Sequence, residues 1–254
     1  MQINSGREDY PKKAELKNLT APTIVAILVA AGAGRRFGAD KNKVLLPLLG
    51  KPVIEWSLEK LEACPQVTDI VVVTAECDLE EVAKITSPYK KVRGITTGGD
   101  CRQESVFRGI LYAGVACDLV LIHDAARPIL PAELIPELIT MVDDTCQGAM
   151  LAVPVHDTIK EAVFESGDCR VVSTLDRDKL FAAQTPQVFV RRTLLSVHEC
   201  AKRESYLATD DAQLLEHYGY GVKILVGNSE NIKITTAPDM LWAELLLKRG
   251  SDTL

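Results

Sequence analysis

The chain has 254 residues, of which 47% are hydrophobic and 25% are charged, and its formal net charge is −6. This composition is ordinary for a globular protein and indicates neither a disordered chain nor a membrane protein. The negative net charge disfavours nonspecific binding to nucleic acid or to an anionic membrane surface. No apolar run approaches the roughly 20 residues that a membrane-spanning helix requires.

The length permits one substantial hydrophobic core, and we expect a single domain over 23–254. Residues 1–22 are polar, mixed in charge and lack the apolar stretch of a signal peptide, so they are expected to form a poorly ordered extension. The seven cysteines are odd in number and include no Cys-x-x-Cys pair. We therefore expect reduced, mostly buried thiols and a cytoplasmic protein, or a plastid-stroma-like compartment if the source is eukaryotic.

Strand and helix patterns alternate in the first half of the chain. They predict strands over 24–29, 70–73 and 119–122 and helices over 52–63 and about 103–113. Repeated strand–helix units predict parallel strands joined by right-handed crossovers. Ligands of such sheets bind beyond the carboxyl ends of the strands, so we expect the chemistry in the loops that follow them.

The loop after the first predicted strand contains both glycines and cations. The glycines are Gly32, Gly34 and Gly38, and the cations are Arg35, Arg36, Lys41 and Lys43. Glycines let backbone N–H groups approach an anion closely, and a following helix adds the positive end of its dipole. The spacing fits neither the dinucleotide fingerprint nor the Gly-x-x-x-x-Gly-Lys-Ser/Thr loop. Four cations suit a triphosphate, the alternative being a solvated basic turn.

A second glycine turn, Gly98-Gly99, leads to Asp100, which we predict to cap a helix with Gln103 three positions later. Arg102 and Ser105 at this helix start have donors and acceptors that suit a flat polar base. The same pattern is also typical of a plain capping box.

Asp124 follows the apolar run 119–122, at the point where that strand leaves the sheet. A carboxylate there can orient a ribose or a magnesium ion. The neighbouring His123 does not form a catalytic triad with it, because adjacent strand residues face opposite sides and no Gly-x-Ser-x-Gly motif supplies a nucleophile. We interpret His123 as a packed or hydrogen-bonded structural residue.

The alternation stops after a strand predicted over 149–155. Residues 157–177 indicate a long hairpin, with an arm over about 156–178, that no helix covers. Such an exposed ribbon commonly pairs with a second copy, and Thr158, Lys160 and Arg177 near its base are placed to bind an anion in the neighbouring subunit. A solvated hairpin is the alternative.

The remaining chain predicts a helix near 191–203, a helix capped at 209–211, a strand over 222–226 and a closing helix over about 238–249. Lys233 lies among apolar residues. Either its stem extends toward solvent or its ammonium group faces a bound anion.

Seven motifs occur in a characteristic order: Ala30-Ala31-Gly32-x-Gly34-x-Arg36 with Lys43, Gly98-Gly99-Asp100-x-Arg102-x-x-Ser105-Val106, His123-Asp124-Ala125-Ala126-Arg127-Pro128, Asp157-Thr158-Ile159-Lys160, Gln184-Thr185-Pro186-Gln187, Thr209-Asp210-Asp211 and Asn231-Ile232-Lys233. From about residue 23 to 245 the series resembles the 2-C-methyl-D-erythritol 4-phosphate cytidylyltransferases of the non-mevalonate isoprenoid pathway. The resemblance implies an α/β, Rossmann-like nucleotidyltransferase domain with a mostly parallel twisted sheet, helices on both faces and a protruding β-hairpin dimerisation arm. It also implies transfer from CTP to methylerythritol phosphate, with Mg²⁺, in a homodimer.

The resemblance also assigns roles by position. Arg36 and Lys43 match residues that neutralise the transition-state phosphate, and Lys233 matches one that contacts the α-phosphate. The positions matched to CTP binding are Ala30, Ala31, Gly32, Gly34, Gly99, Asp100, Ser105, Asp124 (also a candidate metal ligand) and Ala125. The positions matched to the acceptor and its support are Thr158, Arg177, Arg127, Thr185, Thr209 and Asp210. Asn42 stands where many members have proline, so the loop before Lys43 is expected to be less constrained.

The residues agree with this chemistry. A substrate phosphate is mostly dianionic at neutral pH, so it can attack without a general base. Positioned cations and Mg²⁺ must then stabilise the charge on the transferred phosphoryl group and on pyrophosphate. A ribitol-5-phosphate cytidylyltransferase and a non-catalytic nucleotide-binding regulator are the alternatives.

Overall fold

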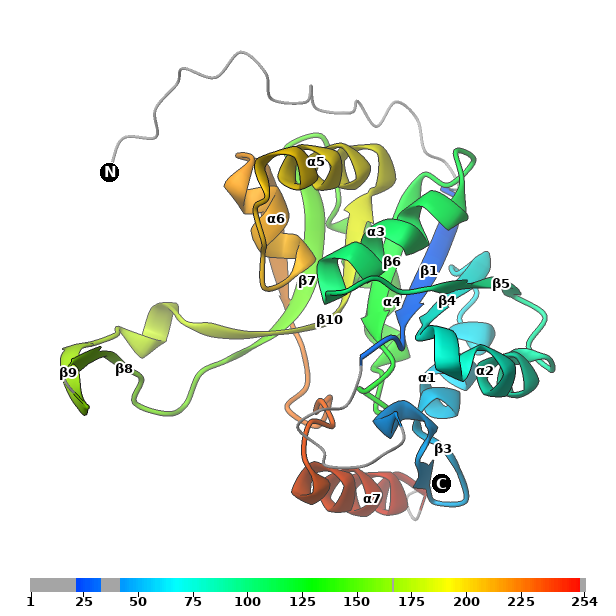
Figure 1. Ribbon diagram of the computed structural model, residues 1–254, viewed down its shortest axis with the longest axis horizontal. Helices are drawn as coiled ribbons and strands as arrows, with labels where there is room; N and C mark the ends of the chain where they lie inside the picture. Colours follow the sequence, from blue (N-terminus) through cyan, green and yellow to red (C-terminus); the bar gives the residue numbers. More distant parts are fainter. Residues whose placement is uncertain (1–21, 33–41, 166, 252–254) are drawn as a thin grey trace.

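The computed structural model describes residues 22–32, 42–165 and 167–251. Within these ranges the main sheet has seven strands. They are β1 (Ile24–Val29), β4 (Asp69–Thr74), β5 (Val92–Thr97), β6 (Leu119–Asp124), β7 (Cys146–Pro154), β10 (Phe181–Val190) and β11 (Gly221–Val226). Their order is β11-β7-β10-β6-β1-β4-β5, and β10 is antiparallel to both of its neighbours while the other pairs are parallel (Figure 1).

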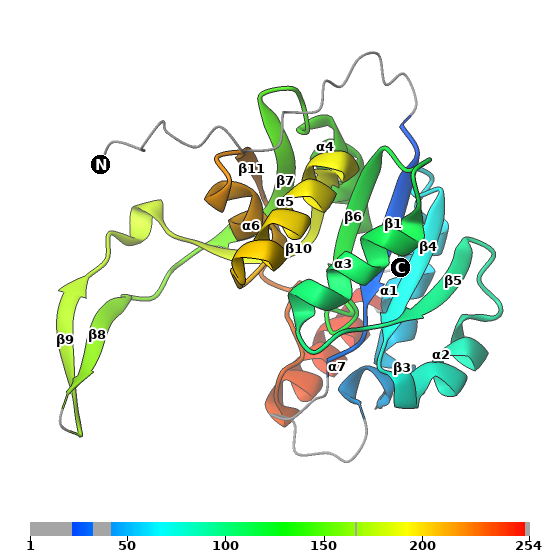
Figure 2. The same cartoon turned by 45° about the horizontal axis from the view of Figure 1, so that its top comes forward.

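Helices cover both faces of this sheet. The helices are α1 (Val53–Ala63), α2 (Leu79–Thr86), α3 (Arg102–Ala113), α4 (Ile135–Thr140), α5 (Arg191–Glu204), α6 (Asp211–His217) and α7 (Ala237–Ser251). One core contains apolar residues of α1, α2 and α4, and the opposite core contains those of α3, α5 and α6 (Figure 2). Successive residues of β1 alternate between the two cores, because a parallel sheet buries both of its faces.

Short elements complete the chain. They are the strands β2 (Pro47–Leu48), β3 (Lys51–Pro52), β8 (Lys160–Glu165) and β9 (Asp168–Thr174) and the 3₁₀ turns η1 (Lys43–Leu45), η2 (Glu76–Asp78), η3 (Ala132–Leu134) and η4 (Arg177–Lys179). A small third core joins α7 to β2 and the start of α1 through Leu48, Val53, Ile234 and Ala243. Among the described residues, no helix has the length and apolar character needed to cross a bilayer.

The strand order creates a switch point beside β1. From β1 the chain moves outward to β4 and β5 and then returns to β6, on the other side of β1. The two strands end together, because Val29 and Asp124 are paired in their register. A crevice at the carboxyl ends of strands on either side of such a switch is the usual ligand site of an open α/β sheet.

The strands β8 and β9 form an antiparallel hairpin that extends from the body of the molecule (Figures 1 and 2). Its apolar side chains are exposed, with Phe164 at 84% and Val171 at 57%. Residues 160–174 thus contain the β8–β9 hairpin, and its role as a dimerisation arm stays a prediction. The arm leaves the sheet after Pro154 and returns at Phe181, and these two residues pair across β7 and β10.

The predicted α/β fold is confirmed, with two differences. The sequence analysis predicted no strand where β10 lies, although this strand lies inside the sheet, between β7 and β6. The expectation of mostly buried cysteines is wrong: all seven are free thiols, but Cys77, Cys101 and Cys169 are exposed and Cys146 is half-buried. The expected N-terminal extension lies outside the described residues, except for residue 22.

Candidate active site

Three predicted loops, which follow β1, β5 and β6, meet at the carboxyl ends of the strands. Gly98, after β5, donates its backbone N–H to the carbonyl of Thr74 at 2.7 Å. A side chain at Gly98 would collide with the Ala31 methyl group and the Ser105 hydroxyl. The absence of a Cβ thus lets the loop after β1 pack directly against the second glycine turn. These loops form the common rim on which the expected nucleotide site depends.

Asn42 anchors the loop that precedes Lys43. Its side-chain amide donates to the Ala30 carbonyl and to Asp78 Oδ2, both at 2.8 Å, and its Oδ1 accepts from the backbone N–H of Val44 at 3.3 Å. Asn42 therefore caps the 3₁₀ turn that contains Lys43 and ties it to the end of β1. The expectation of a less constrained loop concerns mainly residues 33–41, which lie outside the described residues. Gly34 and Arg36 lie outside the described residues.

The second glycine turn differs from its prediction by one position. Cys101, not Asp100, is the N-cap of α3, and its sulfur accepts from the backbone N–H of Glu104 at 3.4 Å. The backbone N–H of Asp100 donates instead to Glu104 Oε2 at 3.0 Å. Ser105 is buried, and its hydroxyl accepts from the Gly99 N–H at 3.1 Å and donates to the Cys101 carbonyl at 2.9 Å. Ser105 thus fixes the shape of this turn.

Asp124 is the centre of the charged site. It ends β6 and is nearly buried, and its Oδ1 accepts from Arg102 Nε at 3.1 Å while its Oδ2 accepts from Lys233 Nζ at 2.5 Å. Burial alone would raise the pKa of Asp124, but the charges of Arg102 and Lys233 hold this pKa well below its ordinary value. The ammonium of Lys233 therefore faces a carboxylate of the protein itself, and its contact with a bound anion stays a prediction.

Polar residues behind Asp124 fix its backbone. Its N–H donates to Thr185 Oγ1 at 3.1 Å, and this hydroxyl also lies 3.0 Å from His123 Nδ1. The other ring nitrogen of His123 lies 3.1 Å from the Arg127 carbonyl. Burial lowers the pKa of His123 to about 4, so the ring is neutral near pH 7. The structural role predicted for His123 is confirmed, and Thr185 supports Asp124 from within the sheet.

Arg127 joins two loops of the rim. Its guanidinium donates to the Asn231 carbonyl at 2.7 Å and to the Ala183 carbonyl at 3.3 Å. The side-chain amide of Asn231 in turn donates to the Thr185 carbonyl at 2.8 Å. These bonds place the segment before Lys233 beside the end of β6. Arg127 therefore acts here on the backbone that positions Lys233.

Two residues of the site, His198 and Asp211, were not among the sequence-predicted site residues. Arg102, which the sequence suggested for a base, instead bridges Asp124 and Asp211, with its Nη1 2.7 Å from Asp211 Oδ2. His198 Nε2 lies 3.3 Å from the other oxygen of Asp211. A signal was available for Asp211, because Asp210 alone suffices to cap α6 and leaves the second carboxylate of the motif for another function. No local pattern marks His198, which lies within α5.

Thr209 and Asp210 lie at the start of α6 and support its position. Asp210 accepts from the Gln213 backbone at 2.8 Å and from Gln187 Nε2 at 3.0 Å, which ties α6 to β10. The Thr209 backbone N–H donates to Gln213 Oε1 at 2.6 Å. The capping predicted for this motif is confirmed, and the two residues act on the helix that carries Asp211.

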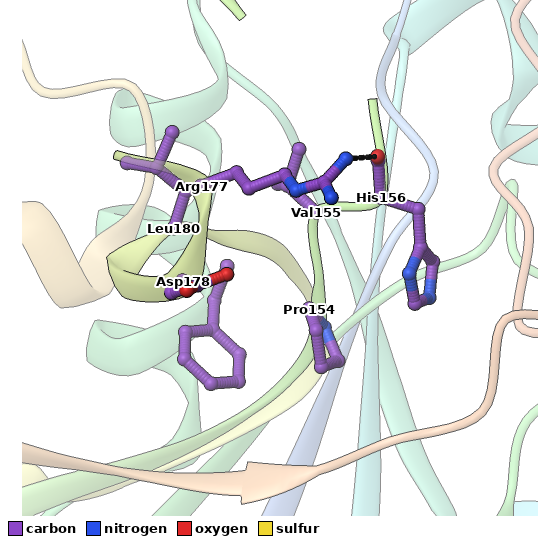
Figure 3. A pocket seen from close by; sticks show the side chains of 7 residues that line it. Pro154, Val155, His156, Arg177, Asp178 and Leu180 are labelled. Carbon is purple, nitrogen blue, oxygen red and sulfur yellow. Dashed lines mark hydrogen bonds between the residues drawn. The ribbon is translucent and has the colours of Figure 1, made fainter. Parts of the chain in front are cut away.

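The base of the arm contains a separate pocket of about 420 Å³. It is lined by Pro154, Val155, His156, Arg177, Asp178, Leu180 and Phe181 (Figure 3). Arg177 Nη1 donates to the His156 carbonyl at 3.0 Å, and Lys160 Nζ donates to Thr174 Oγ1 at 2.7 Å. Thr158 is exposed. The predicted acceptor residues Thr158 and Arg177 thus lie just before β8 and just after β9, at the base of the arm. The arm itself extends away from the body of the molecule (Figure 1).

The side chains at the rim suit a metal ion that binds together with the phosphates of a nucleotide. Within the described residues, no group of three or more His, Cys, Asp or Glu side chains is arranged to hold a metal ion. Mg²⁺ is commonly held by one or two carboxylates together with substrate phosphates and waters. Asp124 provides one such carboxylate at the rim. The residues therefore fit a nucleotide-borne Mg²⁺ and do not form a complete protein cage.

The chain is similar to known proteins over most of its length. The family model described as 2-C-methyl-D-erythritol 4-phosphate cytidylyltransferase matches residues 24–249. The enzyme of this name from Dictyoglomus thermophilum is 40% identical over 229 residues, covering 89% of this chain and 97% of the relative. That of Dehalococcoides mccartyi is 43% identical over 227 residues, covering 89% and 96%.

Solved structures agree with these relatives. The 4-diphosphocytidyl-2C-methyl-D-erythritol synthase of Anaerococcus prevotii has a TM-score of 0.78 and 28% identity, covering 90% of this chain and 97% of its own. The 2-C-methyl-D-erythritol 4-phosphate cytidylyltransferase of Francisella tularensis has a TM-score of 0.73 and 28% identity, covering 88% and 99%. The chain therefore shares its fold with these structures over most of its length.

Proposed function

The chain belongs to the 2-C-methyl-D-erythritol 4-phosphate cytidylyltransferase family, and from this premise we propose how its own residues carry out the reaction. The enzyme joins CTP and 2-C-methyl-D-erythritol 4-phosphate to give 4-diphosphocytidyl-2-C-methyl-D-erythritol and pyrophosphate. An oxygen of the substrate phosphate forms a bond to the α-phosphorus of CTP, and the bond from that phosphorus to the β-phosphate bridging oxygen breaks. Pyrophosphate takes the electron pair.

We place CTP across the carboxyl ends of β1 and β6, which accounts for the glycine turns and the charged residues gathered at the rim. The observation that supports it most is the pairing of Asp124 with Lys233 at 2.5 Å, at the switch point of the sheet. In this proposal Asp124 orients the ribose, and Lys233 exchanges its contact with Asp124 for one with the α-phosphate. The turn from Gly99 to Ser105 and the residues Ala30, Ala31, Gly32 and Ala125 enclose the nucleotide.

Cations stabilise the charge that develops during transfer. We assign Arg36, Lys43 and Lys233 as the catalytic residues, of which Lys43 is fixed by the Asn42 cap at the end of β1. A rate gain of about 10⁶-fold requires roughly 8 kcal/mol, whereas a hydrogen bond to a charged group contributes about 1.5–3. Several cations must therefore act together. Mg²⁺ bound with CTP, with Asp124 as a protein ligand, would supply further positive charge to the phosphates.

No general base is needed in this mechanism. The acceptor phosphate has a second pKa of about 6 and is mostly dianionic near pH 7. The proposal therefore uses His123 only as a neutral structural group, in agreement with its burial and its lowered pKa. What the protein supplies is orientation of the two phosphates and a fixed positive potential.

The acceptor site is proposed to form between two copies of the chain. The arm exposes Phe164, Val171 and Val172, which is unfavourable for a hairpin that stays solvated. Pairing of two arms would bury these side chains and would bring Thr158 and Arg177 of one copy to the rim of the other. The seven free thiols support a reducing compartment, which we take to be the cytoplasm.

An acceptor assay tests the function. Purified protein is given Mg²⁺ and CTP with either 2-C-methyl-D-erythritol 4-phosphate or ribitol 5-phosphate, and pyrophosphate release is measured. We expect turnover with the methylerythritol phosphate and little with the ribitol phosphate. Preference for ribitol 5-phosphate, or CTP binding with no turnover on either acceptor, would contradict the assignment. The family and its relatives do not favour these alternatives.

A further inference from the structure

Asp211 is a buried carboxylate for which the proposed mechanism has no use. It is the first residue of α6, and its side chain is only 1% exposed. The N-cap hydrogen bond of this helix is already supplied by Asp210, whose Oδ1 accepts from the backbone N–H of Gln213 at 2.8 Å. A buried carboxylate costs free energy unless its charge is paired. Its partners therefore indicate why it is present.

Both oxygens of Asp211 have a partner on a different helix. Oδ2 accepts from Arg102 Nη1 of α3 at 2.7 Å, and Oδ1 lies 3.3 Å from His198 Nε2 of α5. The His198 ring is 1% exposed and stacks on Phe107, with 5.8 Å between the ring centroids. Burial would raise the pKa of Asp211, but Arg102 and His198 lower it below its ordinary value. The carboxylate is therefore ionised, hydrogen-bonded to Arg102 on one side and close to the His198 ring on the other.

Arg102 connects this carboxylate to the site. While its Nη1 contacts Asp211, its Nε contacts Asp124 Oδ1 at 3.1 Å. The guanidinium is a rigid planar fork, so fixing one edge on Asp211 fixes which nitrogen meets Asp124. Without Asp211, the guanidinium would be attracted to Asp124 alone and would favour a bidentate contact with both of its oxygens. It would then compete with Lys233, which occupies Oδ2 at 2.5 Å.

We propose that Asp211, with His198 behind it, is a positioning residue that holds Arg102 on one oxygen of Asp124 and leaves the second oxygen to Lys233 and the bound nucleotide. The inference rests on the proposed role of Asp124 in orienting CTP. It gives the second aspartate of the Thr209-Asp210-Asp211 motif an indirect role in the reaction, because Asp211 contacts Arg102, and Arg102 contacts Asp124.

The first test compares two aspartate variants. Asp211→Asn keeps the shape of the side chain and removes its charge, and we expect kcat to fall about tenfold to a hundredfold, the range seen when a residue that orients a ligand is lost. Asp143→Asn is the control, because Asp143 also forms an ion pair, with Lys223 at 2.5 Å, but this pair is exposed and lies at the opposite end of the sheet, before β7. Its kcat should stay within about twofold, as expected for an exposed pair. A folded Asp211→Asn protein with wild-type kcat and KM would overturn the proposal.

The second test asks whether Asp211 acts through Arg102. A lysine at 102 has no fork that can fix one carboxylate by binding the other. In the Arg102→Lys background, Asp211→Asn should therefore lower kcat much less than it does in the wild type. The full loss in both backgrounds would show that Asp211 acts elsewhere, and it would contradict the inference. Residues in direct contact also couple in their effect on stability, so the comparison uses kcat of the folded variants, which an ion pair that only stabilised the fold would leave unchanged in both backgrounds.

The third test does not depend on turnover. In the ¹H–¹⁵N spectrum of the protein without added CTP, the Arg102 Nε–H signal is identified by its loss in Arg102→Lys. We expect slow exchange with water in the wild type, fast exchange or a changed shift in Asp211→Asn, and no change in Asp143→Asn. An unchanged signal in Asp211→Asn would refute the positioning role even if the enzyme is active. If Asp211→Asn changes the signal but the wild type has no cytidylyltransferase activity, the positioning role of Asp211 stands and the proposed function is contradicted.

Two further variants cover the case in which Asp211→Asn does not fold, as judged by thermal unfolding. Asp211→Glu keeps the charge and should retain most of the Nε–H protection, while His198→Gln removes the second support and should reduce it. If both variants are folded and show the wild-type exchange rate and kcat, the proposal fails.

Discussion

Replacing Lys233 with glutamine separates the binding of CTP from its reaction. Lys233 Nζ lies 2.5 Å from Asp124 Oδ2, so contact with a phosphate requires it to give up one charge-assisted hydrogen bond and to form another. Each such bond contributes about 1.5–3 kcal/mol. Because the two contributions nearly cancel, the loss of Lys233 should weaken CTP binding by less than about 1.4 kcal/mol, or tenfold.

The transition state has no such compensation. Negative charge grows on the departing pyrophosphate and on the α-phosphoryl oxygens, and removal of one positioned donor from such a charge costs about 2.7–4 kcal/mol, or roughly 10²- to 10³-fold in kcat. Asp124 keeps its contact with Arg102 in the variant, so the site should remain folded. Lys233→Gln should therefore lower kcat far more than it raises the dissociation constant of CTP.

The assay measures pyrophosphate release at saturating CTP and acceptor, with CTP binding followed by calorimetry. Lys223→Gln is the control, because Lys223 has nearly the same side-chain exposure, 36% against 35%, and also lies 2.5 Å from an aspartate. Its kcat should equal that of the wild type. A kcat of Lys233→Gln within a few-fold of this control, or a loss confined to CTP affinity, would refute the reasoning.

Three further predictions concern other parts of the molecule. Lys43→Ala should reduce kcat far more than CTP affinity, and near-normal turnover would remove Lys43 from the mechanism. The pKa of His123 is about 4 in the folded protein and about 6.5 in the unfolded chain, so the free energy of unfolding should fall by up to about 3 kcal/mol as the pH falls from 6.5 to 4. Urea unfolding of the wild type and of His123→Gln at pH 7 and 4.5 measures this difference. Equal pH dependence of the two proteins would contradict the prediction. Phe164→Asp on the arm should give a folded monomer in light scattering with little turnover, and a persistent dimer would exclude this side chain from the interface.

The parts of the fold that could be predicted were those with a local cause. The strand β1 is visible in the sequence as a continuous apolar run, because both of its faces are buried, and the helix α3 is visible through its helical period, because one face packs into a core. The strand β10 could not be identified in this way. Gln184, Thr185 and Gln187 are polar residues that lie buried within it, and only their partners on other elements make that burial tolerable.

The candidate site divides along the same line. Asp124 and Lys233 could each be singled out from the sequence, because a charged residue beside an apolar segment is conspicuous. Their pairing joins residues 109 positions apart, and no local pattern shows it. The contact between Asp211 and His198 depends on how α5 and α6 pack, which no local pattern records. At Asn42, the sequence could not show that the side-chain amide bonds to Ala30 and Asp78, because both contacts form only when separate loops pack together.

The direction of β10 determines where the arm can be attached. Because this strand enters the sheet at the end where β7 leaves it, the 26 residues between Pro154 and Phe181 start and finish at neighbouring points, and the core requires no crossover from them. Insertions, deletions or a redesigned tip within residues 155–180 should therefore leave the positions of β7 and β10 unchanged. Such freedom would allow acceptor preference and subunit pairing to diversify while the nucleotide half of the enzyme stays constant.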